Sequence, residues 1–437
     1  MKERYFQPNI ETMSREALFA LQSERLLASV ANCYTNIPFY KSSMDALGIL
    51  PGDIMSSDDL NKLPFTTKQD LRDAYPFGLF AINVKDHVQR LHASSGTTGN
   101  ATVCGYTQND IDNWGDCFAR SIAQVGGGSE SIIQIAYGYG LFTGGLGAHE
   151  GGIRSGATIL PMGSGNTRRQ VQMMNDFGTD ILACTPSYAL LIADTALEMG
   201  YNPATDFKLS AAILGAEPWS QGMREEIEEK LGVLAVDIYG LSEVMGPGVS
   251  CECRAQDGLH VAEDHFIIEI LNPDTLLPAP HGEYGEVVFT TLTKECSPLL
   301  RYRTRDISRL LVGECSCGRT LRRMDRIAGR TDDMLIIRGV NVFPSQFQQA
   351  IAGFIEVTNH YEIILTKKDQ LDMVELRVET VPDFDFDEIR RIEALQQRIA
   401  AELKSSLQVN VKVSIVEPKS LSRSEGKAKR VIDKRHL

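Results

Sequence analysis

The sequence predicts an α/β protein with a large N-terminal domain of several sheets and helices, followed by a small α+β C-terminal domain. Two observations predict this class. Helical and strand-like patterns alternate over most of the chain, and short strands with one long amphipathic helix fill its last part. We place the boundary after residue 331, so the domains comprise residues 1–331 and 332–437. Each is long enough to bury a core of its own.

The N-terminal domain opens with a helical pattern over residues 14–47, and a break follows at Pro51-Gly52. Beyond residue 265 the pattern changes to alternating strands around a turn-rich stretch that contains Asn272-Pro273-Asp274. In chain order, the elements expected after the first helix are a helix at 107–125, buried strands at 131–136 and 157–161, a helix at 167–177, and strands at 265–271 and 286–292.

The C-terminal domain is predicted from strands on either side of one helix. Between residues 389 and 407, apolar residues stand three and four positions apart, which is typical of one buried helix face. Strands are expected at 332–338, 361–366 and 374–378 before this helix, and at 409–415 after it.

Composition excludes several classes of protein. Among 437 residues, 57 acidic side chains exceed 44 basic ones, and this balance argues against non-specific binding of nucleic acid or anionic membranes. We expect no membrane partner, because no apolar run is long enough to span a bilayer and the first residues carry no signal region. Nine cysteines, an odd number, favour a cytoplasmic protein with free or metal-bound thiols.

The run Ser94-Ser95-Gly96-Thr97-Thr98-Gly99 lies between two strand-like segments, at 88–92 and 102–107. Its hydroxyls and unblocked backbone N–H groups suit a loop that wraps a polyphosphate. A Ser/Gly linker is the alternative, although linkers are longer and more uniform. No Gly-Lys-Ser/Thr follows, so the run is not a Walker loop.

Two further motifs follow apolar runs, as turns at strand ends do. One is Gly215-Ala216-Glu217-Pro218, and the other is Tyr239-Gly240-Leu241-Ser242-Glu243. In the second, the tyrosine can stack on a base, the serine can meet a phosphate, and the glutamate can hold Mg²⁺, which prefers oxygen ligands. A solvated turn is the alternative for either motif taken alone.

Residues 301–330 carry nine arginines, and this local surplus in an acidic chain favours recognition of an anion. An ordinary network of ion pairs is the alternative. The segment that starts at Gly329-Arg330-Thr331-Asp332 lies on the expected domain boundary, where small and polar residues can act as a hinge.

A metal site is predicted from two cysteine pairs and a histidine. A closed tetrahedral zinc site needs four N or S ligands, often from two segments, and such a site would be structural. Cys251 can replace Cys253 in the ligand set, and free thiols are the alternative. The predicted ligands are Cys253, His260, Cys315 and Cys317.

Taken together, these motifs stand in the same order as in the AMP-forming acyl-CoA synthetases of the adenylate-forming superfamily, which the chain resembles over nearly its whole length. Four segments, at 36–40, 63–68, 137–147 and 338–344, narrow the resemblance to the phenylacetate–CoA ligases. The resemblance implies an acyl-CoA synthetase-like fold with a mobile C-terminal domain. It also implies that an acid and Mg·ATP give an acyl-adenylate, from which CoA displaces AMP.

The resemblance also implies roles for single residues. Residues 94–99 should hold the β- and γ-phosphates, with Thr97 and Thr98 as donors. Lys427 should stabilise charge that develops between carboxylate and α-phosphate, with Lys429 as its nearest rival. The resemblance also places other residues in the site: Gly215, Ala216 and Glu217 around the adenine, Tyr239 on the base, Gly240 in cofactor binding, Ser242 at the α-phosphate, Glu243 at Mg²⁺, Asp306 on the ribose, Arg330 on the nucleotide, Asp332 as hinge and Gly339 at the CoA arm.

The chain departs from many relatives in two places. Asn100-Ala101-Thr102 follows the phosphate loop instead of Pro-Lys-Gly, so no lysine stands there, and Ser242 replaces a threonine. The acid pocket is expected in the aromatic, Gly-rich stretch 137–145, which suits a flat ring. We expect Tyr137 and Phe142 as pocket walls, with Gly144 and Gly215 leaving room, and Trp219 in the core. Core aromatics are the alternative for either ring.

The sequence therefore predicts a cytoplasmic, AMP-forming aryl-acetate–CoA ligase that uses ATP, Mg²⁺ and CoA, with phenylacetate as the leading acid. Hydroxyphenylacetate, indoleacetate and benzoate stay open. One alternative is an adenylating enzyme that passes its acyl group to an amine or a carrier protein. Another is a nucleotide sensor without turnover. A homodimer is the default assembly.

Overall fold

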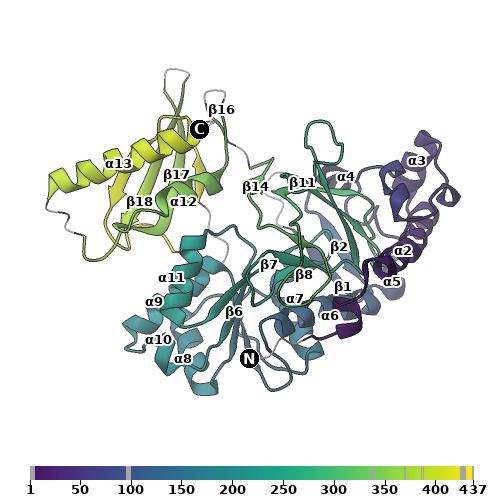
Figure 1. Ribbon diagram of the computed structural model, residues 1–437, viewed down its shortest axis with the longest axis horizontal. Coiled ribbons are helices and arrows are strands. Elements are labelled where there is room, and N and C mark those ends of the chain that lie inside the picture. Colours follow the sequence, from purple (N-terminus) through teal and green to yellow (C-terminus); the bar gives the residue numbers. More distant parts are fainter. Residues whose placement is uncertain are drawn as a thin grey trace.

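The computed structural model describes residues 5–94, 100–333, 335–337, 340–368, 371–384, 386, 388–423 and 430–435. Figure 1 shows a large body of helices and sheets with a smaller unit attached to it, drawn in yellow and light green. We call this smaller part, described residues 335–435, the C-terminal unit. Within the described chain, no helix combines the length and the apolar character needed to cross a bilayer.

An eight-stranded sheet forms the centre of the large body, in the spatial order β13-β9-β8-β7-β6-β5-β3-β4. The strands from β4 to β7 pair in parallel, and β7, β8, β9 and β13 pair antiparallel. The strands are β3 (Ile132–Ile135), β4 (Thr158–Leu160), β5 (Ile181–Cys184), β6 (Ala211–Gly215), β7 (Leu234–Leu241), β8 (Gly246–Glu252), β9 (Leu259–Val261) and β13 (Arg323–Met324).

Helices bury both faces of this sheet. Along β6, Ala211 and Ile213 pack in the core beside Phe118 of α6, while Ala212 and Leu214 pack with the helices of the other face. Because successive strand residues point to opposite faces, a strand covered on both sides is apolar throughout. The covering helices are α6 (Gln108–Gln124) and α7 (Thr143–Arg154) on one face, and α8 (Thr167–Phe177), α9 (Pro186–Glu198) and α11 (Gln221–Leu231) on the other, with α10 (Pro203–Asp206) beside them.

A second core lies between the N-terminal helices and a four-stranded antiparallel sheet of order β10-β11-β12-β14. A separate antiparallel hairpin, β1 with β2, flanks the run at 94–99. The strands are β10 (Phe266–Leu271), β11 (Gly285–Thr291), β12 (Tyr302–Ser308), β14 (Gly329–Arg330), β1 (Arg90–Ala93) and β2 (Val103–Tyr106); the helices are α1 (Pro8–Glu11), α2 (Arg15–Asn36), α3 (Pro38–Leu47), α4 (Lys68–Asp73), α5 (Val84–His87) and the 3₁₀ turns Pro51–Asp53 and Ser57–Lys62.

The C-terminal unit has its own hydrophobic core, in which α13 packs on a four-stranded sheet of order β19-β18-β17-β20. Leu395, Ile399 and Leu403 of α13 are buried there, as the helical spacing predicts. The elements are β15 (Leu335–Ile337), β16 (Val340–Val342), α12 (Pro344–Ile351), β17 (Val357–Lys368), β18 (Leu371–Thr380), α13 (Ile389–Leu407), β19 (Lys412–Val416) and β20 (Val431–Asp433).

Some elements differ from the expectations, which among others did not include α9, α11 and α12. The helix predicted over 14–47 is two helices, because Ile37 before Pro38 is extended, as residues before proline tend to be. Helix α7 was not predicted, since its five glycines lower helix propensity. Strand β12 was not predicted either, because its arginines suggested a binding segment rather than a strand.

Candidate active site

The predicted motifs meet at the carboxyl ends of the central parallel strands. Gly215 is the last residue of β6, and residues 239–243 end the neighbouring strand β7 and lead into β8. Ligands of open α/β sheets usually bind outside the carboxyl ends of the strands. The β1–β2 hairpin reaches the same place, because Thr102 just before β2 lies against Glu243.

The buried Asp306 and the partly buried Tyr239 and Arg330 form a cluster on one side of this site. The Tyr239 hydroxyl donates to Asp306 Oδ2 at 2.6 Å, and Arg330 Nη1 donates to Asp306 Oδ1 at 2.6 Å. Asp306 and Arg330 face each other across β12 and β14. Burial raises the pKa of the Asp306 carboxyl although Arg330 opposes this shift, and burial beside Asp306 raises the pKa of the Tyr239 hydroxyl.

Ser242 and Glu243 lie where the β7–β8 turn meets α7 and the β1–β2 hairpin. Ser242 Oγ lies 3.0 Å from Thr143 Oγ1, in the first turn of α7. Thr102 Oγ1 donates to Glu243 Oε1 at 3.3 Å and lies 2.6 Å from Ser94 Oγ. Oxygen atoms from separate segments therefore converge on one buried carboxylate.

Two lysines also surround Glu243. Lys68 Nζ lies 3.4 Å from Glu243 Oε1, and the buried Lys294 donates to the Glu243 carbonyl at 3.2 Å. The sequence reasoning gave neither lysine a role. Lys68 lies in the segment 63–68 that carried part of the resemblance, but its closeness to Glu243 is a long-range contact that no local pattern marks.

The segment after β6 is fixed by packing. A Cβ on Gly215 would lie 2.2 Å from the Ile238 carbonyl oxygen, so glycine here allows β6 and β7 to pair closely. Ala216 has a φ of +72°, and Glu217 Oε1 accepts from the Ser187 N–H at 2.7 Å. Trp219 is buried, and the guanidinium carbons of Arg224 and Arg326 lie 5.0 and 4.7 Å from the centre of its ring, which agrees with its expected place in the core.

The rings of Tyr137 and Phe142 enclose Gly144. A Cβ built on Gly144 would lie 2.6 Å from a Phe142 ring carbon and 3.5 Å from a Tyr137 ring carbon. Tyr137 is buried and follows β3, whereas Phe142 is half-exposed and precedes α7. The three predicted pocket residues are therefore neighbours, on the side of the site where Thr143 meets Ser242.

The arginines of residues 301–330 are mainly ion-paired, which corrects the preference for anion recognition. Carboxylates lie beside them on neighbouring strands and loops, as in Arg303 with Glu286 at 2.6 Å. Arg330 differs, because it reaches the Tyr239 cluster and also donates to Asp332 at 3.0 Å. Further pairs are Arg301–Glu269, Arg309–Asp325, Arg319–Glu11, Arg323–Asp257 and Arg326–Asp237.

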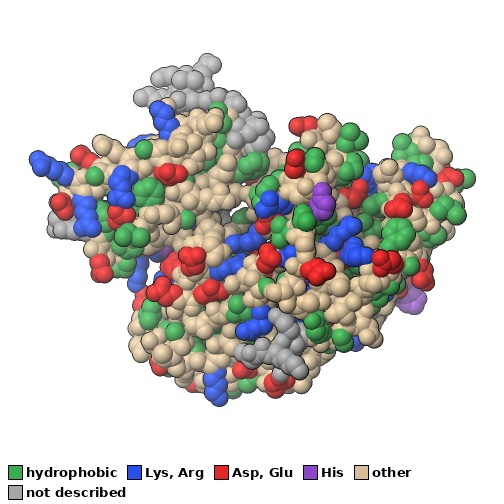
Figure 2. Space-filling view, in the orientation of Figure 1, with side chains coloured by type: hydrophobic (Ala, Val, Ile, Leu, Met, Phe, Trp, Pro, Cys, Tyr) green, Lys and Arg blue, Asp and Glu red, His purple; other side chains and the backbone are tan. Residues whose placement is uncertain are grey.

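Several predicted residues lie outside the part of the chain that the structure describes. They are Ser95, Gly96, Thr97, Thr98, Gly99, Gly339, Lys427 and Lys429. Figure 2 shows Lys and Arg side chains gathered in the hollow between the C-terminal unit and the large body, on the face seen there.

Comparisons with known proteins identify the family. Residues 62–292 match the family model of AMP-binding enzymes, and residues 339–435 match that of the AMP-binding enzyme C-terminal domain. The chain is 50% identical to the phenylacetate-coenzyme A ligase of Escherichia coli (strain K12), over 98% of this chain and 97% of the relative. The chain belongs to the phenylacetate-coenzyme A ligase family of AMP-binding enzymes.

Other members of the phenylacetate-coenzyme A ligase family also match over nearly their whole length. The ligase of Thermus thermophilus is 47% identical, with 98% of this chain and 99% of the relative covered. The family resemblance stated from the motifs is thereby confirmed.

Solved structures confirm the acyl-CoA synthetase-like fold. A 2-hydroxyisobutyryl-CoA ligase in the postadenylation state matches with a TM-score of 0.92 and 27% identity, over 99% of this chain and 93% of that one. The same ligase in the thioesterification state, with CoA, matches with a TM-score of 0.73 and 28% identity, over 98% and 92%. Because the two states are of one protein, the difference reflects how their parts are arranged.

Proposed function

We propose that the protein is an AMP-forming ligase that activates an aryl acetic acid, with phenylacetate as the leading substrate, and transfers the acyl group to CoA. The family supports the reaction class, since the relatives at 47–50% identity are named phenylacetate-coenzyme A ligases. The observation that carries the proposal is the convergence of Tyr239, Asp306, Ser242 and Glu243 at the strand ends, beside an aromatic pair.

The first half-reaction needs two anions to be neutralised and aligned. A carboxylate oxygen attacks the α-phosphorus of ATP, the bond to the bridging oxygen breaks, and pyrophosphate leaves with the electron pair. Alignment and fixed charges supply most of the catalysis in such a transfer. We assign charge stabilisation to Lys427 and the cradle for the departing phosphates to residues 94–99.

The nucleotide is proposed to lie along the Tyr239 cluster. Tyr239 offers its ring face to the base, in a site formed with residues 215–217 and Gly240. Asp306 accepts the ribose hydroxyls and Arg330 helps to hold the nucleotide. Ser242 and Glu243 are consecutive residues, so Ser242 can meet the α-phosphate while Glu243 binds the metal next to it.

Glu243 suits Mg²⁺ by its chemistry. Its carboxylate is buried next to the Thr102 hydroxyl, and magnesium prefers oxygen donors. When bound, the ion would screen the negative charge of the phosphates. Thr102 and Lys68 hold the Glu243 carboxylate in place.

The second half-reaction is proposed to follow a rotation of the C-terminal unit, hinged at Asp332. The thiol of CoA attacks the acyl carbon, and AMP leaves from the tetrahedral intermediate. The present arrangement resembles the postadenylation relative more than the thioesterification one. In the present arrangement two hydrogen bonds join the C-terminal unit to the large body: Gln348 Nε2 donates to Ser220 Oγ at 3.2 Å, and Asn359 Nδ2 donates to Glu226 Oε2 at 2.7 Å. After the rotation, Gly339 would approach the CoA arm.

We also place the enzyme in the cytoplasm, where thiols stay reduced. The nine cysteines are buried and free of disulfides, which fits a reducing compartment. The homodimer stays a prediction.

One experiment tests the proposal and its alternatives together. Purified protein is given ATP, Mg²⁺ and one of a panel of aryl acids; pyrophosphate release is followed, and CoA thioesters are identified by mass. We expect acid-dependent release and phenylacetyl-CoA. Pyrophosphate without a CoA thioester would favour transfer to an amine or a carrier protein, and ATP binding without release would favour a sensor.

The Lys427→Ala variant tests the assignment of the lysine. It should reduce adenylate formation far more than thioester formation from supplied phenylacetyl-adenylate, because only the first step develops charge between carboxylate and phosphate. Lys429→Ala is the matched control. Equal loss in both half-reactions would contradict the role of Lys427.

A further inference from the structure

Four side chains with metal-binding atoms converge away from the active site. Cys253 directly follows β8, His260 lies in β9, and Cys315 and Cys317 lie in the loop between β12 and β13. All four are buried, and their ligand atoms lie within 4.8 Å of one another. The fold therefore joins two segments that are far apart in the sequence.

The distances fit a metal tetrahedron rather than a disulfide. Cys253 Sγ lies 3.6 Å from Cys315 Sγ, and Cys317 Sγ lies 3.3 Å from His260 Nε2. Zinc binds sulfur at about 2.3 Å and nitrogen at about 2.0 Å, so a tetrahedral site has S–S edges of about 3.8 Å and S–N edges of about 3.5 Å. A disulfide would instead need sulfur atoms about 2 Å apart.

Neighbouring groups orient the four side chains. His260 Nδ1 lies 3.3 Å from the Leu321 carbonyl, an arrangement that directs Nε2 toward the sulfur atoms. The Ala255 N–H donates to Cys253 Sγ at 3.4 Å. Gly318 follows the two cysteines with a φ of +79°, a conformation that suits glycine, and its N–H donates to the Cys315 carbonyl at 3.1 Å.

Cys251 takes no part in this cluster. Its side chain is buried in the core that Phe118 of α6 and strands of the central sheet share. Its Sγ also donates to the carbonyl of Glu252 at 3.4 Å. The choice between Cys251 and Cys253 that the sequence left open is thus resolved by geometry in favour of Cys253.

We propose that Cys253, His260, Cys315 and Cys317 bind one zinc ion with three sulfur ligands and one nitrogen ligand. Four protein ligands close the tetrahedron and leave no position for a substrate, so the ion is structural. Binding releases the three thiol protons to solvent and leaves one net negative charge. The buried Arg319 lies two residues after Cys317, and its guanidinium packs over the ring of Tyr5, whose hydroxyl donates to the Cys317 carbonyl. Its positive charge is therefore close to the site.

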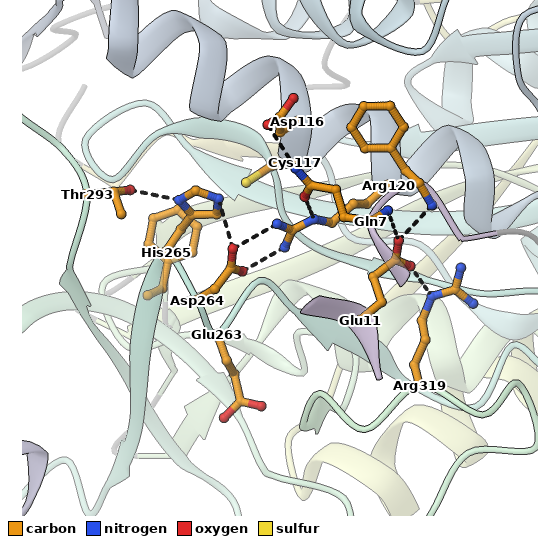
Figure 3. Close-up of polar contacts among 12 residues, drawn as sticks. Gln7, Glu11, Asp116, Cys117, Arg120, Glu263, Asp264, His265, Thr293 and Arg319 are labelled. Atoms are coloured by element: carbon orange, nitrogen blue, oxygen red, sulfur yellow. Dashed lines mark hydrogen bonds and ion pairs between the residues drawn. The ribbon is translucent and has the colours of Figure 1, made fainter. Parts of the chain in front are cut away.

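The zinc would also fasten the N-terminal segment of the chain. The Tyr5 hydroxyl donates to the Cys317 carbonyl at 2.7 Å, and Arg319 Nε donates to Glu11 Oε2 at 2.7 Å. Figure 3 shows how Glu11, held by Arg319, adjoins the buried pair of Arg120 and Asp264, whose two hydrogen bonds measure 2.6 and 2.8 Å. Loss of the metal should therefore loosen residues 5–13 first.

The test begins with the full-length wild-type protein, purified without chelator. Elemental analysis should find about one zinc per chain, and X-ray absorption should show a first shell of sulfur and nitrogen dominated by sulfur. Metal-free protein, or zinc with an oxygen-dominated shell, would overturn the proposal. This result does not depend on ligase activity, so it is separate from the test of the proposed function.

Matched variants then identify the ligands. Cys315→Ser should lose most of the zinc, whereas Cys251→Ser, a change at a buried cysteine nearby, should retain it. Zinc retained by Cys315→Ser, or lost equally from both, would overturn the assignment. If Cys315→Ser does not fold, wild-type protein is titrated with a mercurial thiol reagent beside a chromophoric chelator. Zinc release should then expose the N-terminal segment to protease, and release without such exposure would remove the fastening role.

Discussion

The Gly144→Ala variant tests the proposed acid pocket most directly. The new Cβ would lie 2.6 Å from a Phe142 ring carbon, about 1 Å inside ordinary contact, but only at normal contact distance from Tyr137. The backbone of Gly144 is in an ordinary helical conformation, so alanine strains nothing locally. The half-exposed Phe142 ring must therefore move, and the methyl group takes up room between the two rings.

One methyl group in an apolar pocket changes discrimination by about 1–3 kcal/mol, or roughly 10- to 200-fold in kcat/KM. We expect kcat/KM for phenylacetate to fall by such a factor, while the KM for ATP stays unchanged because the three atoms nearest the methyl belong to Phe142 and Tyr137. The assay is pyrophosphate release at varied acid and at varied ATP. Gly52→Ala is the control, since a Cβ added at Gly52 would have nothing within 4 Å. An unchanged kcat/KM for the acid, or an equal rise in both KM values, would refute the pocket assignment.

Three further predictions concern buried polar groups. Asp306→Ala should raise the KM for ATP about 10-fold or more, because hydrogen bonds to a charged group contribute about 1.5–3 kcal/mol; ATP titration checks it, and an effect on the acid alone would contradict the ribose role. His265 is buried and its pKa is lowered to about 4, so below pH 6.5 the unfolded chain takes up a proton that the folded chain does not. The free energy of unfolding should therefore keep the full contribution of His265 above pH 6.5 and fall by about 3 kcal/mol toward pH 4. Urea unfolding at several pH values measures this: the free energy of unfolding should depend less on pH in His265→Gln than in the wild type, and equal pH dependence would contradict the role of His265. Asp264→Asn leaves the buried Arg120 unpaired and should cost about 3–5 kcal/mol of unfolding free energy, whereas replacing Arg120 by Met together with Asp264 by Leu should cost less; similar losses in both variants would contradict the argument.

Much of the fold follows from local patterns in the sequence. The two-sided burial of β6 makes it apolar throughout, and the spacing of Leu395, Ile399 and Leu403 marks one face of α13, so both could be recognised. Helix α7 could not, because its glycines serve close packing: a Cβ on Gly147 would lie 2.3 Å from the Trp114 ring, and one on Gly151 would lie 2.4 Å from Phe118. Propensity alone cannot indicate a helix whose small residues are required by its neighbour.

The candidate site was predictable where its residues follow one another in sequence and less so where they meet only in space. Residues 239–243 end a strand, and the sequence marks that place. Lys68 reaches Glu243 from a distant helix, and no spacing rule connects the two. The arginines of residues 301–330 were misjudged for the same reason, since their carboxylate partners, such as Glu269 and Glu286, lie on other strands.

Arg330 binds two carboxylates that the proposal gives to different tasks. Its Nη1 holds Asp306, which is assigned to the ribose, and its Nε holds Asp332, which is assigned to the hinge. Because one guanidinium holds both carboxylates, nucleotide binding and the orientation of the C-terminal unit are thermodynamically coupled. If the nucleotide favours one orientation by a given free energy, that orientation must bind the nucleotide more tightly by the same free energy. We expect AMP to bind with different affinity before and after the rotation, so that departure of the product and return of the C-terminal unit become one energetically coupled event.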